Sequence, residues 1–585
     1  MLPRHLFQGL RPFAARSAAR SGAVRGMTAS ALAAIALLGA TASAQAATLQ
    51  VGNGAEPGTL DPQQVSGNWE SRITRELFDR LIDYGADGSL VPGLASSWEL
   101  SDDGTTYTFH LREAEWSDGE PLTADDAVYG FRRLLMPETA NHNANLYYPI
   151  VNARAINTGQ APPEALGVEA LDEQTLVIRL SEPTAYFLQA LAMTEAAPLP
   201  RHLIEGGPDK WTRPGVMVSS GAFVLADWRP QDRIEVERNP RYYAADEVAL
   251  DGVVFHAIED PSAALNRFRA GDLDISYSGV PSSRFSWVQD NLPDALKVGP
   301  LTGSYFYMAN VRGGQPLSDA RIREALNLAL RREVITERLI GMGQTPSYWY
   351  VPRSVSGSSQ GRLGLGDEPL AAADMPARLA RARQLLEQAG YGPERPLRLT
   401  LSYNTLEDHK KIAVAIAAMW KPLGVELELI NREAAVHFAT LRQGDFELAR
   451  YGMIATVDDP FDFLNAYATG GSAATSTGFD DPDYDELVRR STLELDPAKR
   501  AALMTEAEQR LLDANVLLPI YDYISAHLVS PRVQGWQSTV LDVHPLRYVS
   551  KPVSKPVSRP VTEDDGDRGD DGRSDDDGKR QETQP

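Results

Sequence analysis

The sequence predicts an α/β protein that is divided into two lobes with a hinge between them. The chain has 585 residues, which is more than one hydrophobic core usually supports, so two or three lobes are expected. Short strands dominate up to about residue 305, and beyond it strands alternate with longer helices, as in βαβ units. Residues 517–528 then form a predicted strand that returns to the first lobe. Both lobes would therefore be discontinuous in sequence, and the crossovers would form the hinge.

The first 46 residues have the pattern of a secretory signal peptide. Five arginines without an acidic residue precede an apolar run at 29–40, and small-residue cleavage sites follow at 42–46. The chain contains no cysteine, so neither a lipid anchor on that residue nor a disulfide is expected. No second apolar stretch has membrane-spanning length. We therefore expect a soluble, monomeric protein in a Gram-negative periplasm.

The charge balance argues against nucleic acid as a partner. The formal net charge is -22, and loss of the five N-terminal arginines would lower it to about -27. A protein of this charge repels phosphate backbones and anionic membrane surfaces.

Local patterns place the elements of the first lobe in order. An alternating strand at 48–51 leads through a turn-rich loop into an amphipathic helix at 68–83. Thr123 and the acidic residues after it are typical of a helix start, and the helix is expected at 127–135. Further expected elements are strands at 97–100, 107–111, 176–180, 219–225, 234–238 and 253–258, and a helix at 261–270.

The remainder of the chain is richer in helices and ends in a segment of different composition. Helices are expected at 319–340, 371–389, 409–423, 481–494 and 497–514. After residue 548 the sequence becomes Pro-rich and then acidic, without aromatic residues. Residues 551–585 are therefore predicted to form a disordered tail.

An apolar strand at 448–454 that ends in a polar turn is the first candidate for a binding site. Open α/β sheets place their ligands at such carboxyl ends of strands. Arg450 on this strand needs an anionic partner if it is buried, and that partner is either a ligand carboxylate or a structural Asp or Glu. His409 begins an expected helix together with two lysines, against the preference of the macrodipole, which makes it a candidate anion contact. A solvated helix start is the alternative for His409.

The sequence carries no strong signal of catalysis. Gly357, Ser359 and Gly361 match a nucleophile motif, but the flanking residues indicate a loop instead of a strand that enters a helix. No second histidine lies at metal-ligand spacing from His409, and no phosphate-binding loop occurs. We therefore predict no catalytic residue, no metal site and no cofactor, and we expect a binding protein instead of an enzyme.

Several blocks of the sequence resemble the bacterial extracellular solute-binding family 5, and most closely its periplasmic oligopeptide-binding proteins. The resemblance extends from about residue 49 to residue 549. It is carried by residues 60–62, 77–81, 92–98, 107–112, 116–119, 220–223, 238–243, 319–326 and 389–391.

The resemblance implies the large, class II-like periplasmic-binding-protein fold of the peptide and nickel type, with three domains in two lobes. Such a protein closes around a peptide and delivers it to an inner-membrane ABC permease and its ATPases. The expected division gives 47–80, 198–305 and 525–550 to the first lobe, 81–197 to an extra domain of that lobe, and 306–524 to the second lobe.

The resemblance also implies roles for single residues. Arg450 falls on the arginine that binds the peptide carboxylate, and His409 on a histidine that serves longer peptides. Tyr523 falls on a pocket tyrosine. The strand that pairs with the peptide contains Gly452, Met453 and Ile454, and the facing loop contains Gly67, Asn68 and Trp69.

Departures from the family pattern leave the ligand open. Thr456 stands where the peptide binders place an aspartate for the ligand's α-ammonium group, and Asp458 is a candidate replacement. Met453 and Ala434 stand at tryptophan positions. Gly303 and Ile454 stand where the closest relatives have a pair of cysteines.

The expected ligand is an ordinary oligopeptide, because that is the family's main ligand class. The alternatives are an N-blocked or modified peptide, or another anionic solute. A secreted chaperone-like protein and a serine hydrolase are further alternatives.

Overall fold

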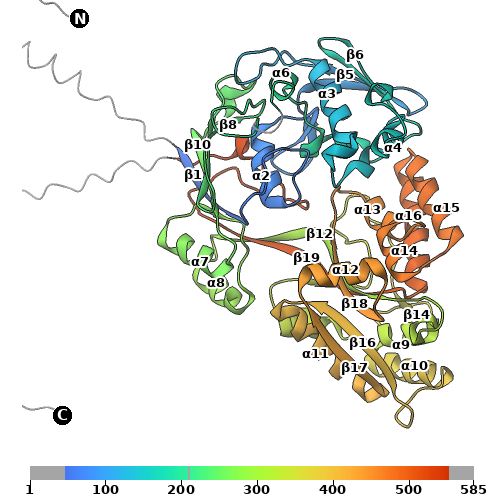
Figure 1. The fold of residues 1–585 in the computed structure, drawn as a ribbon. Coiled ribbons are helices and arrows are strands. Elements are labelled where there is room, and N and C mark those ends of the chain that lie inside the picture. Colours follow the sequence, from blue (N-terminus) through green and yellow to red (C-terminus); the bar gives the residue numbers. More distant parts are fainter. Residues whose placement is uncertain (1–46, 208–210, 553–585) are drawn as a thin grey trace, which may run out of the picture. The chain divides into compact units, whose positions relative to one another are not determined.

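The computed structural model describes residues 47–207 and 211–552 (Figure 1). The predicted signal peptide and almost all of the predicted tail lie outside the described residues, so those two predictions stay untested. The main feature is an 11-stranded mixed sheet with the order β17-β16-β18-β12-β19-β11-β1-β10-β9-β8, in which β13 (Thr345–Pro346) pairs with β19.

The first part of this sheet is built around β1 (Thr48–Gly54). β1 pairs in parallel with β10 (Gly252–Ala257) and with β11 (Ile275–Ser276). β9 (Arg233–Arg238) and β8 (Phe223–Arg229) continue the sheet as an antiparallel pair. The predicted strands at 48–51, 234–238 and 253–258 are thus confirmed. Apolar side chains that alternate along β1, such as Leu49 and Val51, are fully buried, which is what a covered sheet requires. The helices of this part are α2 (Asn68–Leu77), α6 (Arg201–Ile204), α7 (Pro261–Ala270) and α8 (Phe285–Asn291).

A second, four-stranded antiparallel sheet has its own core. Its order is β4-β5-β7-β6, and α3 packs on it through a cluster that includes Phe109, Phe131 and Phe187. The bounds are β4 (Ala95–Leu100), β5 (Thr106–Leu111), α3 (Ala124–Leu135), α4 (Ala153–Asn157), β6 (Val168–Asp172), β7 (Thr175–Arg179) and α5 (Phe187–Leu191).

The second lobe contains the predicted βαβ unit. β16 (Leu397–Asn404) and β17 (Val425–Arg432) are parallel neighbours joined by α11 (Glu407–Trp420), which buries Ile416 and Trp420. β18 (Leu448–Ile454) lies on the other side of β16. The other elements are α9 (Ala320–Leu328), β14 (Gly364–Leu365), β15 (Glu368–Pro369), α10 (Met375–Gln388), α12 (Ala434–Gln443), α13 (Pro460–Leu464), α14 (Ser472–Thr477), α15 (Pro482–Leu493) and α16 (Pro497–Asp513).

Two long strands continue the sheet from one lobe into the other. β12 (Leu296–Ala309) and β19 (Leu517–Val529) are antiparallel partners along most of their length, with a register shift between Pro300 and Ser304. β19 also pairs with β11 of the first lobe through Leu528 and Val529. The prediction that residues 517–528 return to the first lobe is therefore confirmed, while the exact domain bounds stay a prediction.

Three predicted helices have different bounds in the structure. The helix expected at 68–83 ends at Leu77, where Arg80 donates hydrogen bonds to the carbonyls of Arg75 and Phe78, and β2 (Ile82–Tyr84) pairs with β3 (Leu90–Pro92). The helix expected at 319–340 ends as α9 at Leu328, and a wider π-type turn, η8 (Val334–Ile340), follows.

The third difference concerns the helix expected to begin at His409. α11 begins at Glu407, so its first turn contains the acids Glu407 and Asp408. The prediction that the helix starts at His409 was therefore wrong. The first turn carries the acids that the helix macrodipole favours, so His409 is no longer unusual at that place.

Candidate functional site

A cavity of about 590 Å³ lies between the start of α2 and the end of β18. It brings together Gly67, Asn68 and Trp69 from the first lobe with Ile454 and Thr456 from the second. Five of the eleven predicted binding residues thus line one cavity. The other lining residues are Asn53, Gly54, Val65, Ser66, Ser71, Arg72, Arg75, Glu76, Tyr84, His142, Asn143, Met193, Thr194, Glu195, Tyr277, Ala455, Leu541, Asp542, Val543 and His544.

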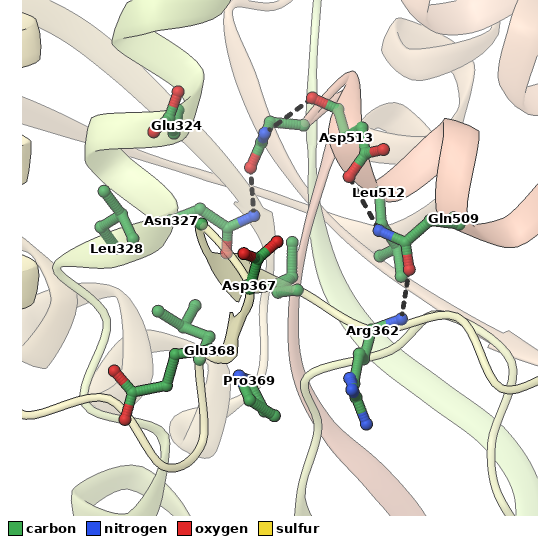
Figure 2. Close-up of a pocket in the computed structure, with 15 residues that line it drawn as sticks. Glu324, Asn327, Leu328, Arg362, Asp367, Glu368, Pro369, Gln509, Leu512 and Asp513 are labelled. Atoms are coloured by element: carbon green, nitrogen blue, oxygen red, sulfur yellow. Dashed lines mark hydrogen bonds between the residues drawn. The ribbon is translucent and has the colours of Figure 1, made fainter.

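A separate pocket of about 320 Å³ lies in the second lobe (Figure 2). It is lined by Glu324, Asp367, Glu368 and Asp513 beside Arg362, and it contains none of the predicted site residues. Because it does not involve the end of β18 or the facing loop, we regard the larger cavity as the candidate site.

Glu70 fixes the facing loop to the start of α2. Its carboxylate accepts hydrogen bonds from the backbone N–H groups of Gly58 (2.8 Å), Ser66 (2.6 Å) and Gly67 (3.1 Å). This is the half of a capping box that an acid at the third helical position supplies, since Gly67 at the N-cap has no side chain to return a hydrogen bond. The Trp69 ring then lies directly against Gly67, since a Cβ atom there would be 2.5 Å from the ring.

β18 offers an unpaired backbone edge beside the cavity. It pairs with β12 from Leu448 to Ile454, but with β16 only at Leu448 and Ala449. Within the described part of the chain, the segment 451–454 therefore has a strand partner on one side only. Ile454 at its end is 50% exposed. An extended ligand backbone can add to such an edge as a further strand.

Arg450 is buried and has neutral partners. Its side chain is 8% exposed, donates to Oδ1 of Asn404 (3.2 Å) and to Oη of Tyr523 (2.5 Å), and lies 4.8 Å from the centroid of the Tyr305 ring. Among residues 47–207 and 211–552, no carboxylate oxygen lies within 4.0 Å of its guanidinium. The structural salt bridge considered from the sequence is thus wrong for the described residues. Nε of Arg450 also has no hydrogen-bond partner there.

His409 lies close to Arg450 as a neutral side chain. Burial and the neighbouring Arg450 charge lower the pKa of His409 to about 4. A neutral ring that donates through Nδ1 to the carbonyl of Asn404 (3.1 Å) presents a lone pair at Nε2. This arrangement does not favour an anion, so the direct anion contact considered for His409 is not supported by the geometry.

A residue larger than glycine would not fit at position 452, because the side chains of Tyr523 and Arg450 occupy the space. A Cβ atom there would lie 2.4 Å from Oη of Tyr523 and 2.9 Å from Nη2 of Arg450. Arg450, Tyr523, His409 and Gly452 therefore form a second group of predicted residues, which we call the Arg450 group.

Asp458 and Met453 make contacts away from the cavity. The Asp458 carboxylate accepts hydrogen bonds from the backbone N–H (2.8 Å) and the hydroxyl of Ser356, and Met453 accepts one from Tyr350 (3.4 Å). Neither residue lines the cavity.

The turn after β18 is held by an acid further along the chain. The backbone N–H of Thr456 donates to the Asp462 carboxylate (2.5 Å), and burial raises the pKa of Asp462 to about 6. This contact fixes the Thr456 backbone at the cavity wall.

Several charged residues of the cavity were missed by sequence reasoning. Arg72 donates to Oδ1 (2.9 Å) and to the carbonyl oxygen (3.1 Å) of Asn53 and lies 3.9 Å from the centroid of the Tyr277 ring. Burial raises the pKa of Glu76, another cavity residue, to about 7. The spacing of Arg72 and Arg75 places both on one face of α2 and could have identified them.

No helix of the described chain combines the length and the apolar composition that crossing a membrane requires.

Comparison with known proteins identifies what the chain resembles. The family model for bacterial extracellular solute-binding proteins, family 5 (middle region), matches residues 89–475. The periplasmic oligopeptide-binding protein OppA of Escherichia coli K12 is 36% identical over 496 residues, which cover 84% of this chain and 89% of that protein. A probable deoxycholate-binding periplasmic protein of the same organism, YgiS, is also 36% identical, with 83% and 89% covered. The crystal structure of Haemophilus influenzae OppA in complex with the peptide RPPGFSPFR has a TM-score of 0.73 and 34% identity, with 87% of this chain and 99% of that chain covered.

Proposed function

This chain belongs to the bacterial extracellular solute-binding proteins of family 5, and we propose from that premise that it is the periplasmic binding component of an oligopeptide-type ABC importer. It captures a peptide between its two lobes and delivers it to the membrane permease and its ATPases. The name of the 36% identical OppA and the peptide complex of the Haemophilus relative support a peptide ligand.

The observation that carries this proposal is the unpaired edge of β18 between the cavity and Arg450. A peptide that pairs with residues 451–454 gains main-chain hydrogen bonds that do not depend on its sequence. Its C-terminal carboxylate then meets a buried guanidinium that has only neutral partners. A charge-assisted, bidentate contact of this kind favours one end of the ligand strongly.

A second candidate ligand is an anionic solute that is not an ordinary peptide. The similarity to a probable deoxycholate-binding protein favours it, as does Thr456, which offers no charge for a peptide ammonium group. Asp458 does not compensate, because its carboxylate is engaged by Ser356.

The buried serine motif supports binding over hydrolysis. Ser359 is fully buried and its hydroxyl donates to the Glu508 carboxylate. A nucleophilic serine would need a neighbouring base and access to the substrate. Glu508 instead accepts further hydrogen bonds from the backbone N–H groups of Tyr350 (2.8 Å) and Val351 (2.7 Å), which fixes it within the fold. We therefore assign this motif a structural role.

Thermal unfolding with three forms of one tripeptide tests the proposal, because a ligand that binds the native state raises the melting temperature. The free tripeptide, its N-acetylated form and its C-amidated form are each added to the purified chain. Stabilisation by the free and acetylated forms, but not by the amidated form, is expected if Arg450 holds the carboxylate.

Other results would change the assignment. Stabilisation by the free and amidated forms, but not by the acetylated form, would make the ammonium group the main anchor, and stabilisation by the free form alone would mean that both termini are held. If no peptide stabilises the chain but deoxycholate does, the anionic-solute alternative replaces the peptide.

A further inference from the structure

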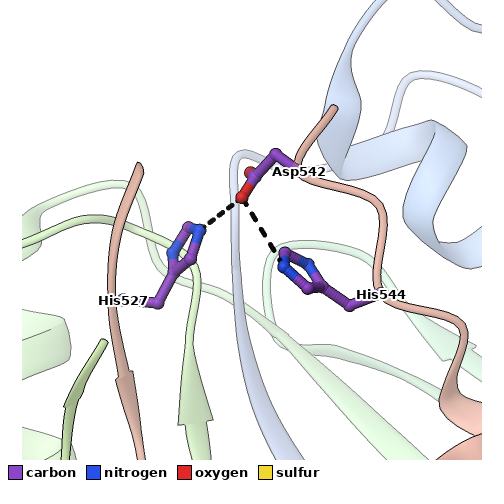
Figure 3. A group of neighbouring side chains, drawn as sticks. All are labelled: His527, Asp542 and His544. Atoms are coloured by element: carbon purple, nitrogen blue, oxygen red, sulfur yellow. Dashed lines mark hydrogen bonds and ion pairs between the residues drawn. The ribbon is translucent and has the colours of Figure 1, made fainter. Parts of the chain in front are cut away.

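Three side chains with metal-ligand atoms meet at the wall of the cavity (Figure 3). His527 comes from β19, and Asp542 and His544 come from the segment that follows it. Nε2 of His527 lies 2.6 Å from Oδ1 of Asp542, and Nε2 of His544 lies 3.8 Å from the same oxygen. The ligand atoms of all three residues lie within 4.8 Å of one another. We propose that this cluster is a binding site for a divalent transition-metal ion of the zinc type.

The donor set suits such an ion. Two imidazoles and one carboxylate are the ligands that zinc and its neighbours accept in sites with one open position. In tetrahedral zinc sites, bonds of about 2.1 Å place the ligand atoms roughly 3.4 Å apart. The His544 nitrogen therefore has to approach Asp542 by about 0.4 Å, and the Asp542–His527 pair has to open by about 0.8 Å.

The unpartnered nitrogens of His544 distinguish this proposal from an ordinary structural His–Asp pair. The hydrogen bond to Asp542 accounts for Nε2 of His527 only. Within the described residues, Nδ1 of His527 and both ring nitrogens of His544 have no hydrogen-bond partner. His544 is 7% exposed, and leaving a buried polar atom without a partner is destabilising. A metal ion would give one of these nitrogens a partner and would replace the proton between His527 and Asp542.

The surroundings of the cluster hold the rings in place. The Trp536 ring stacks on His544 with centroids 4.5 Å apart, and the Tyr277 ring stacks on His544 at 5.4 Å. Tyr277 also meets His527 edge to face, with centroids 5.0 Å apart. Rigid aromatic walls keep ligand rings oriented and exclude bulk water. The positive charge of Arg72, which lies over the Tyr277 ring, repels a metal cation at this cluster. The affinity for zinc is therefore expected to be moderate.

The open coordination position faces the candidate site. Asp542 and His544 line the same cavity as Gly67 and Thr456. The fourth ligand of the ion is therefore a water molecule or a donor atom of a solute in the cavity. The proposal does not depend on the proposed function, because the three protein ligands are present without a peptide.

Titration calorimetry with ZnCl₂ alone, on the full chain treated with a chelator, tests the site. One zinc ion per chain is expected, with binding weakened at least about 100-fold by His544→Gln or Asp542→Asn, since each removes one of three ligands. Asp542→Asn keeps the side-chain size, so it provides a test even if His544→Gln fails to fold, which circular dichroism would reveal.

The matched control is His202→Gln. His202 pairs with Asp118 at 2.9 Å on the surface, the described residues supply no third ligand there, and its loss should leave zinc binding unchanged. The proposal is overturned if the chain binds no zinc, or if both cluster variants bind it as tightly as the parent chain. Because no peptide is added, neither result bears on peptide import.

Discussion

Two buried arginines in this protein have opposite surroundings. Arg80 is 1% exposed and contacts the Asp83 carboxylate, which also binds Arg547. Arg450 is also buried, at 8% exposed, but its partners are the amide of Asn404, the hydroxyl of Tyr523 and the face of Tyr305. The first group is neutralised within the fold, and the second has a positive charge without a countercharge in the described part of the chain.

This difference separates a structural ion pair from a binding group. A buried charge is stable when it is paired and fully hydrogen-bonded, and it is costly otherwise. Asp83 gives Arg80 a countercharge within the chain itself, although Nε of Arg80, like Nε of Arg450, has no hydrogen-bond partner among the described residues. The Arg450 site has no such carboxylate among the described residues. A ligand carboxylate that binds there would form the buried ion pair that Asp83 forms with Arg80.

The largest expected effect comes from breaking the neutralised group. Asp83→Asn leaves Arg80 and Arg547 without their shared carboxylate and should lower the free energy of unfolding by about 3–5 kcal/mol. Urea denaturation followed by circular dichroism measures this loss. Glu169→Gln, which removes the exposed partner of Arg179 (2.9 Å), should change it by less than about 0.5 kcal/mol. Equal effects of the two variants would contradict the comparison.

A change at Arg450 should affect ligand affinity more than stability, the reverse of the change at Asp83. Arg450→Gln is expected to weaken binding of a ligand with a free carboxylate by about 2–5 kcal/mol, because a buried charged contact is lost. The free energy of unfolding should hardly fall, since no partner charge is left behind. Calorimetric titration and urea denaturation of the same variant give both numbers.

Arg398→Gln is the matched control for this prediction. Arg398 lies on the same lobe and pairs with Glu426 at the surface (2.9 Å), so its loss should leave the affinity unchanged. An Arg450 variant that unfolds as readily as the Asp83 variant would show that the site is structural.

The same contrast holds for carboxylates and predicts a pH dependence. Arg547 and Arg80 hold the pKa of Asp83 well below its usual range, whereas burial raises the pKa of Asp522 to about 6. Since the pKa of Asp522 is higher in the folded state, its contribution to stability is present below about pH 4 and is lost as the pH rises to about 6. Asp522→Asn keeps an acceptor for Trp349 and should stabilise the protein by about 1–2 kcal/mol at pH 7.5 and hardly at pH 4. Melting temperatures at both pH values check this, and a pH-independent difference would contradict it.

The smallest effect concerns the shape of the Arg450 group. Gly452→Ala places a methyl group 2.4 Å from Oη of Tyr523, so both Tyr523 and Arg450 must move. A loss of affinity of about 1.4 kcal/mol, or tenfold, is expected. Adding Tyr523→Phe should restore part of it, because the phenol oxygen is the closest atom. Gly313→Ala, with open space at that position, is the control, and a double variant weaker than Gly452→Ala would refute the steric cause.

The sequence predicted those parts of the site that follow from local patterns. The apolar run before Asp458 indicated β18 and the burial of Arg450, and the start of α2 indicated the facing loop. The resemblance placed Gly303 and Ile454 at equivalent paired positions, and they are direct partners in the β12–β18 register. The end of α2 at Leu77 was not predicted, because it depends on Arg80 turning back onto carbonyls of the helix and onto Asp83.

What the sequence by itself determined is the order of elements, the return of β19 to the first lobe and the residues available to each strand, since periodicity and turn residues act over a few neighbours. Only the tertiary structure decided that Arg450 has no carboxylate beside it, that Asp458 is engaged by Ser356, and that His527 meets His544. These contacts join residues that local sequence patterns cannot relate, because their distance depends on how the lobes and long connections pack.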